Sequence, residues 1–145
     1  MKTVLIADDH AIVRNALAAL VASIGEAEVI AEADNGIETI ALVRAHRPDV
    51  LLLDAAMPLA RGVEVFAEVR RWSPHTRVAV VTGFTSATML ADWMAAGVDA
   101  LFLKSCPPEE MRHGIEMVLE GGRYVSKAVA ARIAQVSQPP AVTAR

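Results

Sequence analysis

The stretch Pro48-Asp49-Val50-Leu51-Leu52-Leu53-Asp54-Ala55-Ala56-Met57-Pro58 decides how the rest of the chain is interpreted. Four apolar residues run without interruption into one carboxylate, and a proline follows four residues later. Such a run predicts a strand that is buried on both faces, as in a parallel sheet. Asp54 would then lie at the carboxyl end of the strand, where open α/β sheets form their sites. On this stretch alone, a strand that simply ends in a solvated aspartate fits at least as well.

Four more short apolar runs alternate with segments of helical periodicity. They are Thr3–Ala7, Glu28–Ala33, Arg77–Thr82 and Ala100–Leu103. After the first run, Ile12, Leu17 and Val21 recur at helical spacing and predict a helix with these side chains inward. The whole pattern contains five strands and five helices in alternation. It predicts an α/β fold with a doubly wound five-stranded parallel sheet flanked by five helices.

Composition narrows the class of protein. The chain has 145 residues, of which 54% are hydrophobic, and its mean hydropathy is +0.37, as expected of a sheet covered on both faces. No apolar run reaches the ~18–20 residues of a membrane-spanning helix, so no membrane association is expected. The start of the chain lacks the hydrophobic region of a secretory signal. The single cysteine, Cys106, excludes an internal disulfide and fits a structural role in the reducing cytoplasm.

Charge is unevenly distributed along the chain. The net charge is −3, but residues 123–145 contain four basic residues and no acid, so the first 122 residues carry −7. A body of that charge binds DNA poorly on its own. The basic tail is expected to be a solubilising linker. Within it, Ala128–Val136 can form one short helix, and Ser137-Gln138-Pro139-Pro140 has the composition of an interdomain linker.

Four of the five predicted strands end in residues suited to phosphoryl chemistry. These residues are Asp8 with Asp9, Asp54, Thr82 and Lys104. In a parallel sheet the four ends share one edge. Three carboxylates held together repel one another unless a cation joins them, and Mg²⁺ with oxygen ligands resolves this. Lysine and threonine would then bind phosphoryl oxygens while Asp54 attacks as the nucleophile.

These motifs resemble the receiver domain of two-component response regulators. The resemblance rests on Val4-Leu5-Ile6-Ala7-Asp8-Asp9-His10, on Leu-Leu-Leu-Asp-x-x-Met-Pro around Asp54, on Val80-Val81-Thr82-Gly83 and on Leu103-Lys104, and covers roughly residues 2–123. It implies the flavodoxin-like receiver fold, with Asp54 as phosphoacceptor. Asp9, Asp54 and the backbone carbonyl of Ala56 would bind Mg²⁺ directly, and Asp8 would help through water. Thr82 and Lys104 would contact the phosphoryl group.

The resemblance also implies partners and a mode of action. The phosphoryl donor would be a sensor histidine kinase, and the chain would be a phosphoacceptor switch rather than an enzyme, with no organic cofactor. Asp8-Asp9-His10 and Gly121-Gly122-Arg123-Tyr124-Val125-Ser126 resemble the NarL/LuxR-type subfamily. Its members carry a helix-turn-helix output domain that opens with Leu-Thr-x-Arg-Glu, and Val142-Thr143-Ala144-Arg145 is similar to the first residues of that pattern.

On this interpretation the chain divides into a receiver domain, 2–123, and a linker with a short helix, 124–145. The linker would lead to an output domain that is not present in this chain. DNA would be bound only through that domain, and phosphorylation would produce a homodimer. The alternative is a stand-alone receiver that acts in a phosphorelay or through a protein partner. Two further alternatives are an aspartyl-nucleophile phosphatase and a receiver that takes no phosphate.

The last two alternatives are disfavoured by particular residues. The phosphatase would need a second acid two residues after its nucleophile, where this chain has Ala56. A receiver that takes no phosphate is disfavoured because no acceptor, metal or lysine position of a receiver is missing.

The chain departs from the receiver pattern at Leu101, where an aromatic residue is usual, which puts the usual hydroxyl–aromatic switch in doubt. Ala56 and bulky Phe84 flank the expected phosphoryl group and predict an acyl phosphate of modestly long lifetime.

Overall fold

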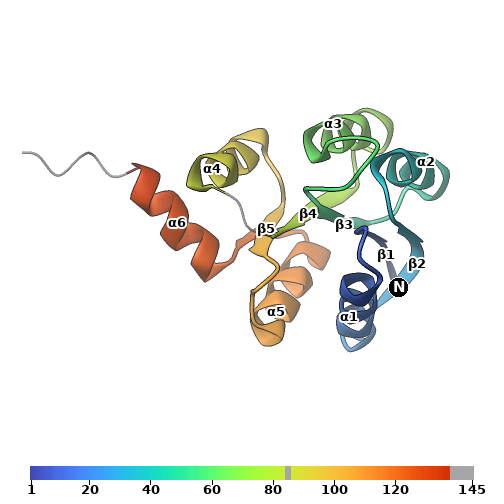
Figure 1. The fold of residues 1–145 in the computed structure, drawn as a ribbon. Coiled ribbons are helices and arrows are strands. Elements are labelled where there is room, and N and C mark those ends of the chain that lie inside the picture. The colour runs from blue at the N-terminus through green and yellow to red at the C-terminus, as the bar shows by residue number, and fades with distance from the viewer. Residues whose placement is uncertain (84–85, 138–145) are drawn as a thin grey trace, which may run out of the picture.

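A six-stranded parallel sheet forms the centre of the computed structural model, which describes residues 1–83 and 86–137 (Figure 1). The strands lie in the order β2-β1-β3-β4-β5-β6. They are β1 (Lys2–Ala7), β2 (Ala27–Ala33), β3 (Val50–Asp54), β4 (Arg77–Thr82), β5 (Ala100–Leu103) and β6 (Tyr124–Val125). The helices are α1 (Ala11–Ala22), α2 (Gly36–His46), α3 (Gly62–Trp72), α4 (Ala87–Ala96), α5 (Pro108–Leu119) and α6 (Lys127–Ser137).

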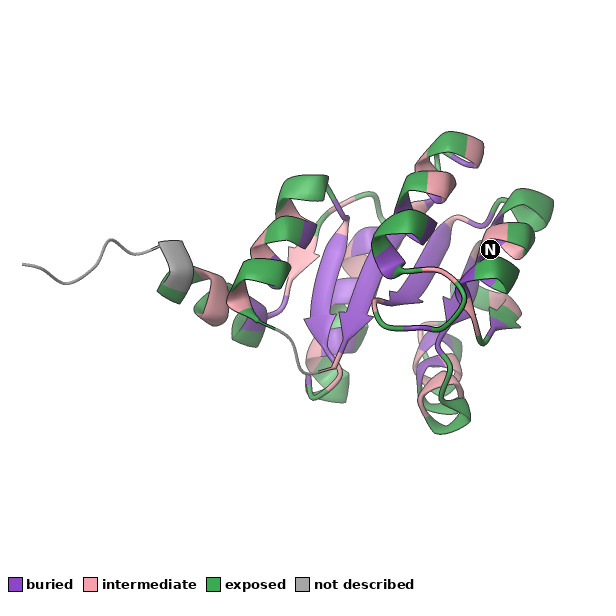
Figure 2. Ribbon diagram, turned by 45° about the horizontal axis from the view of Figure 1, so that its top comes forward, coloured by how far each residue is buried: buried purple, intermediate pink, exposed green. Residues whose placement is uncertain are grey.

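The continuous apolar run of β3 follows from helices on both faces of the sheet. Leu51 and Leu53 face the core beneath α2, α3 and α4, whereas Val50 and Leu52 face the core beneath α1 and α5. Successive side chains of a strand point to opposite faces, so a strand covered on both sides has no polar position. Figure 2 shows the buried strands enclosed by helices with exposed outer surfaces. The predicted parallel α/β architecture is confirmed.

The loop that follows Asp54 is held close to two helix starts by glycine. A Cβ atom at Gly62 would lie 2.7 Å from the carbonyl oxygen of Ala55, and one at Gly36 would lie 2.5 Å from Cβ of Ala60. Gly36 N also donates a hydrogen bond to the carbonyl of Pro58 at 2.9 Å. The backbone therefore packs against α2 and α3 at distances that no larger residue allows. This packing fixes the loop beside the end of β3.

The predicted counts of five strands and five helices are corrected to six of each within the described residues. The additional strand, β6, has two residues and pairs with β5 through Ala100–Tyr124 and Leu101–Val125. The sixth helix, α6, is the short helix predicted at Ala128–Val136, and it packs against α4 and β5 and buries Val129 completely. A two-residue strand has no periodicity to detect. It forms because β5 would otherwise leave an open sheet edge.

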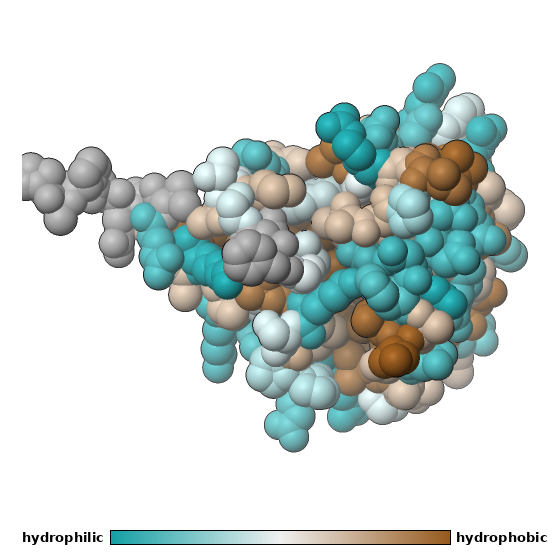
Figure 3. Space-filling model, in the orientation of Figure 1, coloured by the Kyte–Doolittle hydropathy of each residue, from teal (hydrophilic) through white to brown (hydrophobic). Residues whose placement is uncertain are grey.

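Ile12, predicted to face the core, is on the surface. Ile12 is 83% exposed, because it lies about 140° around α1 from the buried Leu17 at 100° per residue. Figure 3 shows the exposed apolar side chains of one face as separate patches. In the described part of the chain, no helix has the length and apolar character needed to cross a membrane.

Candidate functional site

The predicted site residues converge at the carboxyl edge of the sheet. Asp8 directly follows β1, Asp54 ends β3, Thr82 ends β4 and Lys104 directly follows β5. These four strands are consecutive neighbours in the sheet and all run in the same direction. The end of each strand therefore places its residue beside the next, as the sequence predicted. Residues up to 96 positions apart in the chain form one cluster.

A single ammonium group joins the two buried carboxylates. Nζ of Lys104 lies 3.1 Å from Oδ2 of Asp8 and 3.3 Å from Oδ2 of Asp54. Asp8 is 1% exposed and Asp54 is 3% exposed, whereas the lysine side chain retains 24% of its exposure. The carboxylates are thus buried, whereas the lysine that joins them remains partly exposed to solvent.

Burial and neighbouring charges shift the pKa values of Asp54 and Lys104. It raises the pKa of Asp54, and the neighbouring Asp8 carboxylate raises it further, against the hydrogen bond from Ala56 N and the charge of Lys104. Burial alone would lower the pKa of Lys104. The carboxylates of Asp8 and Asp54 outweigh this effect, so its pKa is raised and the ammonium stays charged. Asp54 is therefore a basic carboxylate held next to a permanent cation.

The cluster also has the composition of a site for a hard divalent cation. Asp8, Asp9, His10 and Asp54 each offer one ligand atom, and these atoms all lie within 4.8 Å of one another. Oδ2 of Asp8 is buried, and its ion pair with Lys104 does not meet hydrogen-bond geometry. Carboxylate oxygens are the ligands that Mg²⁺ prefers, and one lysine leaves the three acids with excess negative charge. The donor set therefore fits such an ion.

The other predicted residues lie around Asp54. Ala56 N donates a hydrogen bond to Oδ1 of Asp54 at 3.1 Å, which holds this loop against the carboxylate. Thr82 is buried, and its carbonyl accepts a hydrogen bond from Lys104 N at 2.7 Å. Leu101 is fully buried under α6 in the same core cluster as Val129. Phe84 lies outside the described residues.

Two residues of the cluster were not selected from the sequence. His10 is 66% exposed at the side chain and places Nδ1 3.1 Å from Oδ1 of Asp9. Arg14 donates a hydrogen bond from Nη1 to the carbonyl oxygen of Asp8 at 2.8 Å. The only signal for Arg14 is its position in the second turn of the helix that follows the acids.

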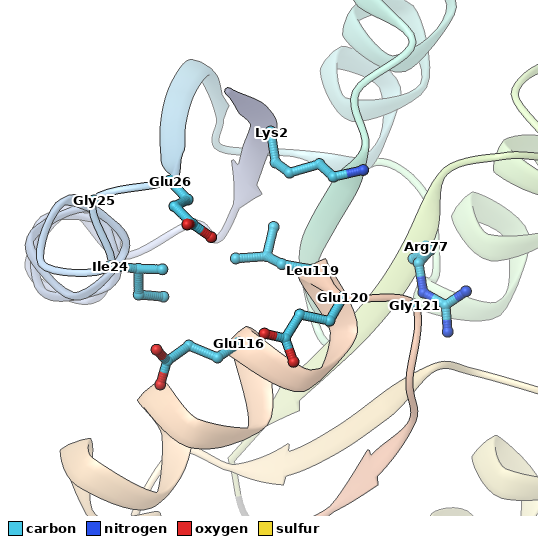
Figure 4. Close-up of a pocket in the computed structure, with 9 residues that line it drawn as sticks. All are labelled: Lys2, Ile24, Gly25, Glu26, Arg77, Glu116, Leu119, Glu120 and Gly121. Carbon is cyan, nitrogen blue, oxygen red and sulfur yellow. The ribbon is translucent and has the colours of Figure 1, made fainter.

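A pocket of about 880 Å³ lies at the opposite edge of the sheet (Figure 4). Lys2 and Arg77, which begin β1 and β4, line it together with Glu26, Glu116 and Glu120. Both positive and negative side chains line this pocket, and none of the predicted site residues is among them.

Comparison with known proteins gives a consistent result. The model of the response regulator receiver domain family matches residues 4–116. The chain is 34% identical over 140 residues to the response regulator GacA of Pseudomonas aeruginosa, covering 97% of this chain but 65% of that protein. It thus spans about two thirds of the length of this curated relative.

Two solved structures are also similar. One is a LuxR-family two-component response regulator from Aurantimonas sp. SI85-9A1, with a TM-score of 0.86, 29% identity, and coverage of 94% of this chain and 97% of that one. The other is a LuxR-family DNA-binding response regulator from Staphylococcus aureus, with a TM-score of 0.76, 32% identity, and coverage of 82% and 99%.

Proposed function

This chain belongs to the receiver domain family of two-component response regulators, and we propose that it is switched by accepting a phosphoryl group on Asp54. One observation carries the proposal. Asp54 ends a central strand as a buried carboxylate of raised pKa, with the Lys104 ammonium 3.3 Å away and a second carboxylate, Asp8, on the same ammonium. A nucleophile, a fixed cation and a set of metal ligands are thus adjacent.

The transfer takes place between two protein side chains. The Asp54 carboxylate attacks the phosphorus of a phosphohistidine on a sensor histidine kinase. The new O–P bond forms as the N–P bond breaks, and the imidazole ring keeps the electron pair of the broken bond. Charge accumulates on the three remaining phosphoryl oxygens, where the Lys104 ammonium and the Thr82 hydroxyl bind them. Because the attacking form is the carboxylate, transfer requires Asp54 to be deprotonated.

Asp9, Asp54 and the backbone carbonyl of Ala56 would hold Mg²⁺ directly, with Asp8 acting through water. Bound Mg²⁺ supplies positive charge that neutralises the carboxylates and the phosphoryl oxygens. The protein's part is to gather the acids at one edge of the sheet before any ion binds. The excess negative charge and the close spacing of the carboxylate oxygens of Asp8, Asp9 and Asp54 support this assignment.

The chemistry is that of a switch rather than of a turnover enzyme. The acyl phosphate is the product, and only its slow hydrolysis returns Asp54 to the free acid. A phosphatase with an aspartate nucleophile would need a general acid two residues later, where Ala56 has only a methyl group. The receiver is therefore expected to turn over no small phosphate ester.

The receiver, predicted as residues 2–123, would regulate a DNA-binding output domain in the same protein. Residues 124–145 would be the connection, the first part of which packs on the receiver as β6 and α6. The chain spans 65% of GacA, and the Staphylococcus aureus structure is that of a DNA-binding regulator. Phosphorylation would favour a homodimer, in the cytoplasm. The alternative is a stand-alone receiver that acts on a protein partner. The complete reading frame distinguishes the two.

The deciding experiment for the acceptor is intact-protein mass after incubation with acetyl phosphate and Mg²⁺. Wild type should gain one phosphoryl group, and Asp54→Asn should gain none. A control without Mg²⁺ should give little adduct. Equal adducts on wild type and Asp54→Asn would place the modification elsewhere and refute the proposal.

A further inference from the structure

Arg14 links the acidic loop to two elements of the sheet. Its Nη1 donates a hydrogen bond to the carbonyl oxygen of Asp8 at 2.8 Å. Its Nε lies 3.2 Å from Oε1 of Glu32, on β2, in an ion pair that also satisfies hydrogen-bond geometry. The side chain is 22% exposed, so most of it is packed. One guanidinium thus bridges α1, the end of β1 and β2.

The contacts of Asp8 explain why this bridge matters. Asp8 N donates to the carbonyl of Ala33 at 3.0 Å, and Oδ1 accepts from His10 N at 2.8 Å. The carbonyl oxygen is held by Arg14, and Oδ2 is left facing Lys104. Asp8 is 1% exposed, so its carbonyl needs a donor from within the protein. Arg14 thereby fixes the backbone from which the acid projects.

We propose that Arg14, oriented by Glu32, is a positioning residue that holds the Asp8–Asp9 loop in the geometry that binds Mg²⁺. The inference rests on the proposed function, since it concerns the same site. Arg14 touches a backbone atom and no ligand atom of the metal set. It acts by limiting the rotation of the loop, so that the acids need no rearrangement when the ion arrives.

The positive charge of Arg14 makes it possible to distinguish positioning from electrostatics by the direction in which Mg²⁺ affinity changes. A cation near the acids repels Mg²⁺ through space, so removing it for electrostatic reasons alone would tighten metal binding. Loss of a positioning contact would weaken binding instead. Groups that orient metal ligands commonly change affinity by roughly 10–100-fold. The two effects therefore predict opposite changes in the dissociation constant.

The test is calorimetric titration of Mg²⁺ into wild type, Arg14→Met and Arg14→Lys. Arg14→Met should raise the dissociation constant about tenfold. Arg14→Lys should fall between it and wild type, because an ammonium lacks the rigid fork that reaches both partners. Arg123→Met is the matched control. It removes a guanidinium bond of 2.8 Å to the carbonyl of Val98, remote from the site, and should leave the dissociation constant unchanged.

Thermal unfolding in EDTA, run in parallel, reports structural damage separately from metal affinity. Unchanged or tighter Mg²⁺ binding by Arg14→Met would overturn the inference, whatever its melting temperature. If Arg14→Met does not fold, Arg14→Lys decides, and wild-type affinity in that variant would overturn the inference. Wild type that binds no Mg²⁺ would instead refute the proposed function, and the inference with it.

Discussion

Nζ of Lys104 lies 3.3 Å from Oδ2 of Asp54, although β4 separates the strands that deliver the two residues. The same ammonium also forms an ion pair with Asp8, whose Oδ2 lies 3.1 Å from Nζ. Two buried carboxylates therefore share one cation, and negative charge remains in excess. Burial, with the Asp8 carboxylate adding to it, raises the pKa of Asp54. The site is thus arranged for a further cation and a phosphoryl group at some expense of stability.

The stability lost by burying the Asp54 carboxylate can be measured with Asp54→Asn. A carboxyl group whose pKa is raised by folding stabilises the protein below its unfolded pKa, and this contribution is lost as the pH rises through the folded pKa. At pH 7 in EDTA, Asp54→Asn should therefore raise the unfolding midpoint by roughly 2–4 °C, the shift that ~1 kcal/mol produces in a domain of this size. The gain should shrink as the pH falls through the folded pKa of Asp54, because the carboxyl group then becomes neutral in the folded protein. Asp92→Asn, at an exposed position of α4, is the control, and a less stable Asp54→Asn would contradict the argument.

Helix α6 is expected to contribute to the stability of the domain. Val129 is fully buried in the core cluster that contains Leu101 and Trp93. Val129→Ala should lower the free energy of unfolding by about 2 kcal/mol, measured by urea denaturation, because it leaves a cavity between α6 and the sheet. Lys127→Ala, at an exposed position of the same helix, should change it by less than ~0.5 kcal/mol. Equal effects would mean that α6 is not docked in solution.

Tyr124 provides a spectroscopic test of the contact between α5 and α6. Glu110 accepts hydrogen bonds from Tyr124 Oη at 2.7 Å and from Lys127 N at 2.8 Å. Burial, together with the Glu110 carboxylate, raises the pKa of Tyr124 to about 12. Because Tyr124 is the only tyrosine, phenolate absorbance reports it alone. Glu110→Gln should lower the midpoint but not to 10, the ordinary value, since burial remains.

Exposed Glu109→Gln is the control for this titration and should leave the midpoint unchanged. Since the folded pKa is the higher one, the stabilising contribution of the neutral phenol is complete below the ordinary value and is lost as the pH rises through about 12. A wild-type midpoint near 10 would contradict both the burial of Tyr124 and its contact with Glu110, and equal midpoints for wild type and Glu110→Gln would contradict the contact alone.

Cys106 should be chemically silent in the folded protein. Burial, with the Glu110 carboxylate adding to it, raises the pKa of its thiol to about 12. At about pH 8 the reactive thiolate is therefore scarce, and a disulfide reagent should label native protein far more slowly than protein unfolded in guanidinium. Ser105→Cys in a Cys106→Ser background moves the thiol to an exposed position and should react rapidly. Comparable rates for wild type and this control would contradict the prediction.

Much of the fold and the site could be predicted from local patterns. The apolar runs that end in Asp54, Thr82 and Lys104 predicted parallel strands, and parallel strands bring these ends to one edge. Helix faces were less certain, as exposed Ile12 shows, because spacing alone does not say which side of the helix meets the sheet. Strand β6 was missed because its pairing depends on the edge of β5 rather than on its own two residues.

The amino-acid sequence by itself determined which chemistry is available: four buried strands that end in an acid, a hydroxyl or an amine. Only the tertiary structure decided that Lys104 reaches both Asp8 and Asp54. It also decided that Arg14 bonds to the carbonyl of Asp8 and to the carboxylate of Glu32. The reason is physical. The periodicity of a strand depends only on neighbouring residues. A contact between distant residues depends instead on strand order and on the packing of helices across the sheet.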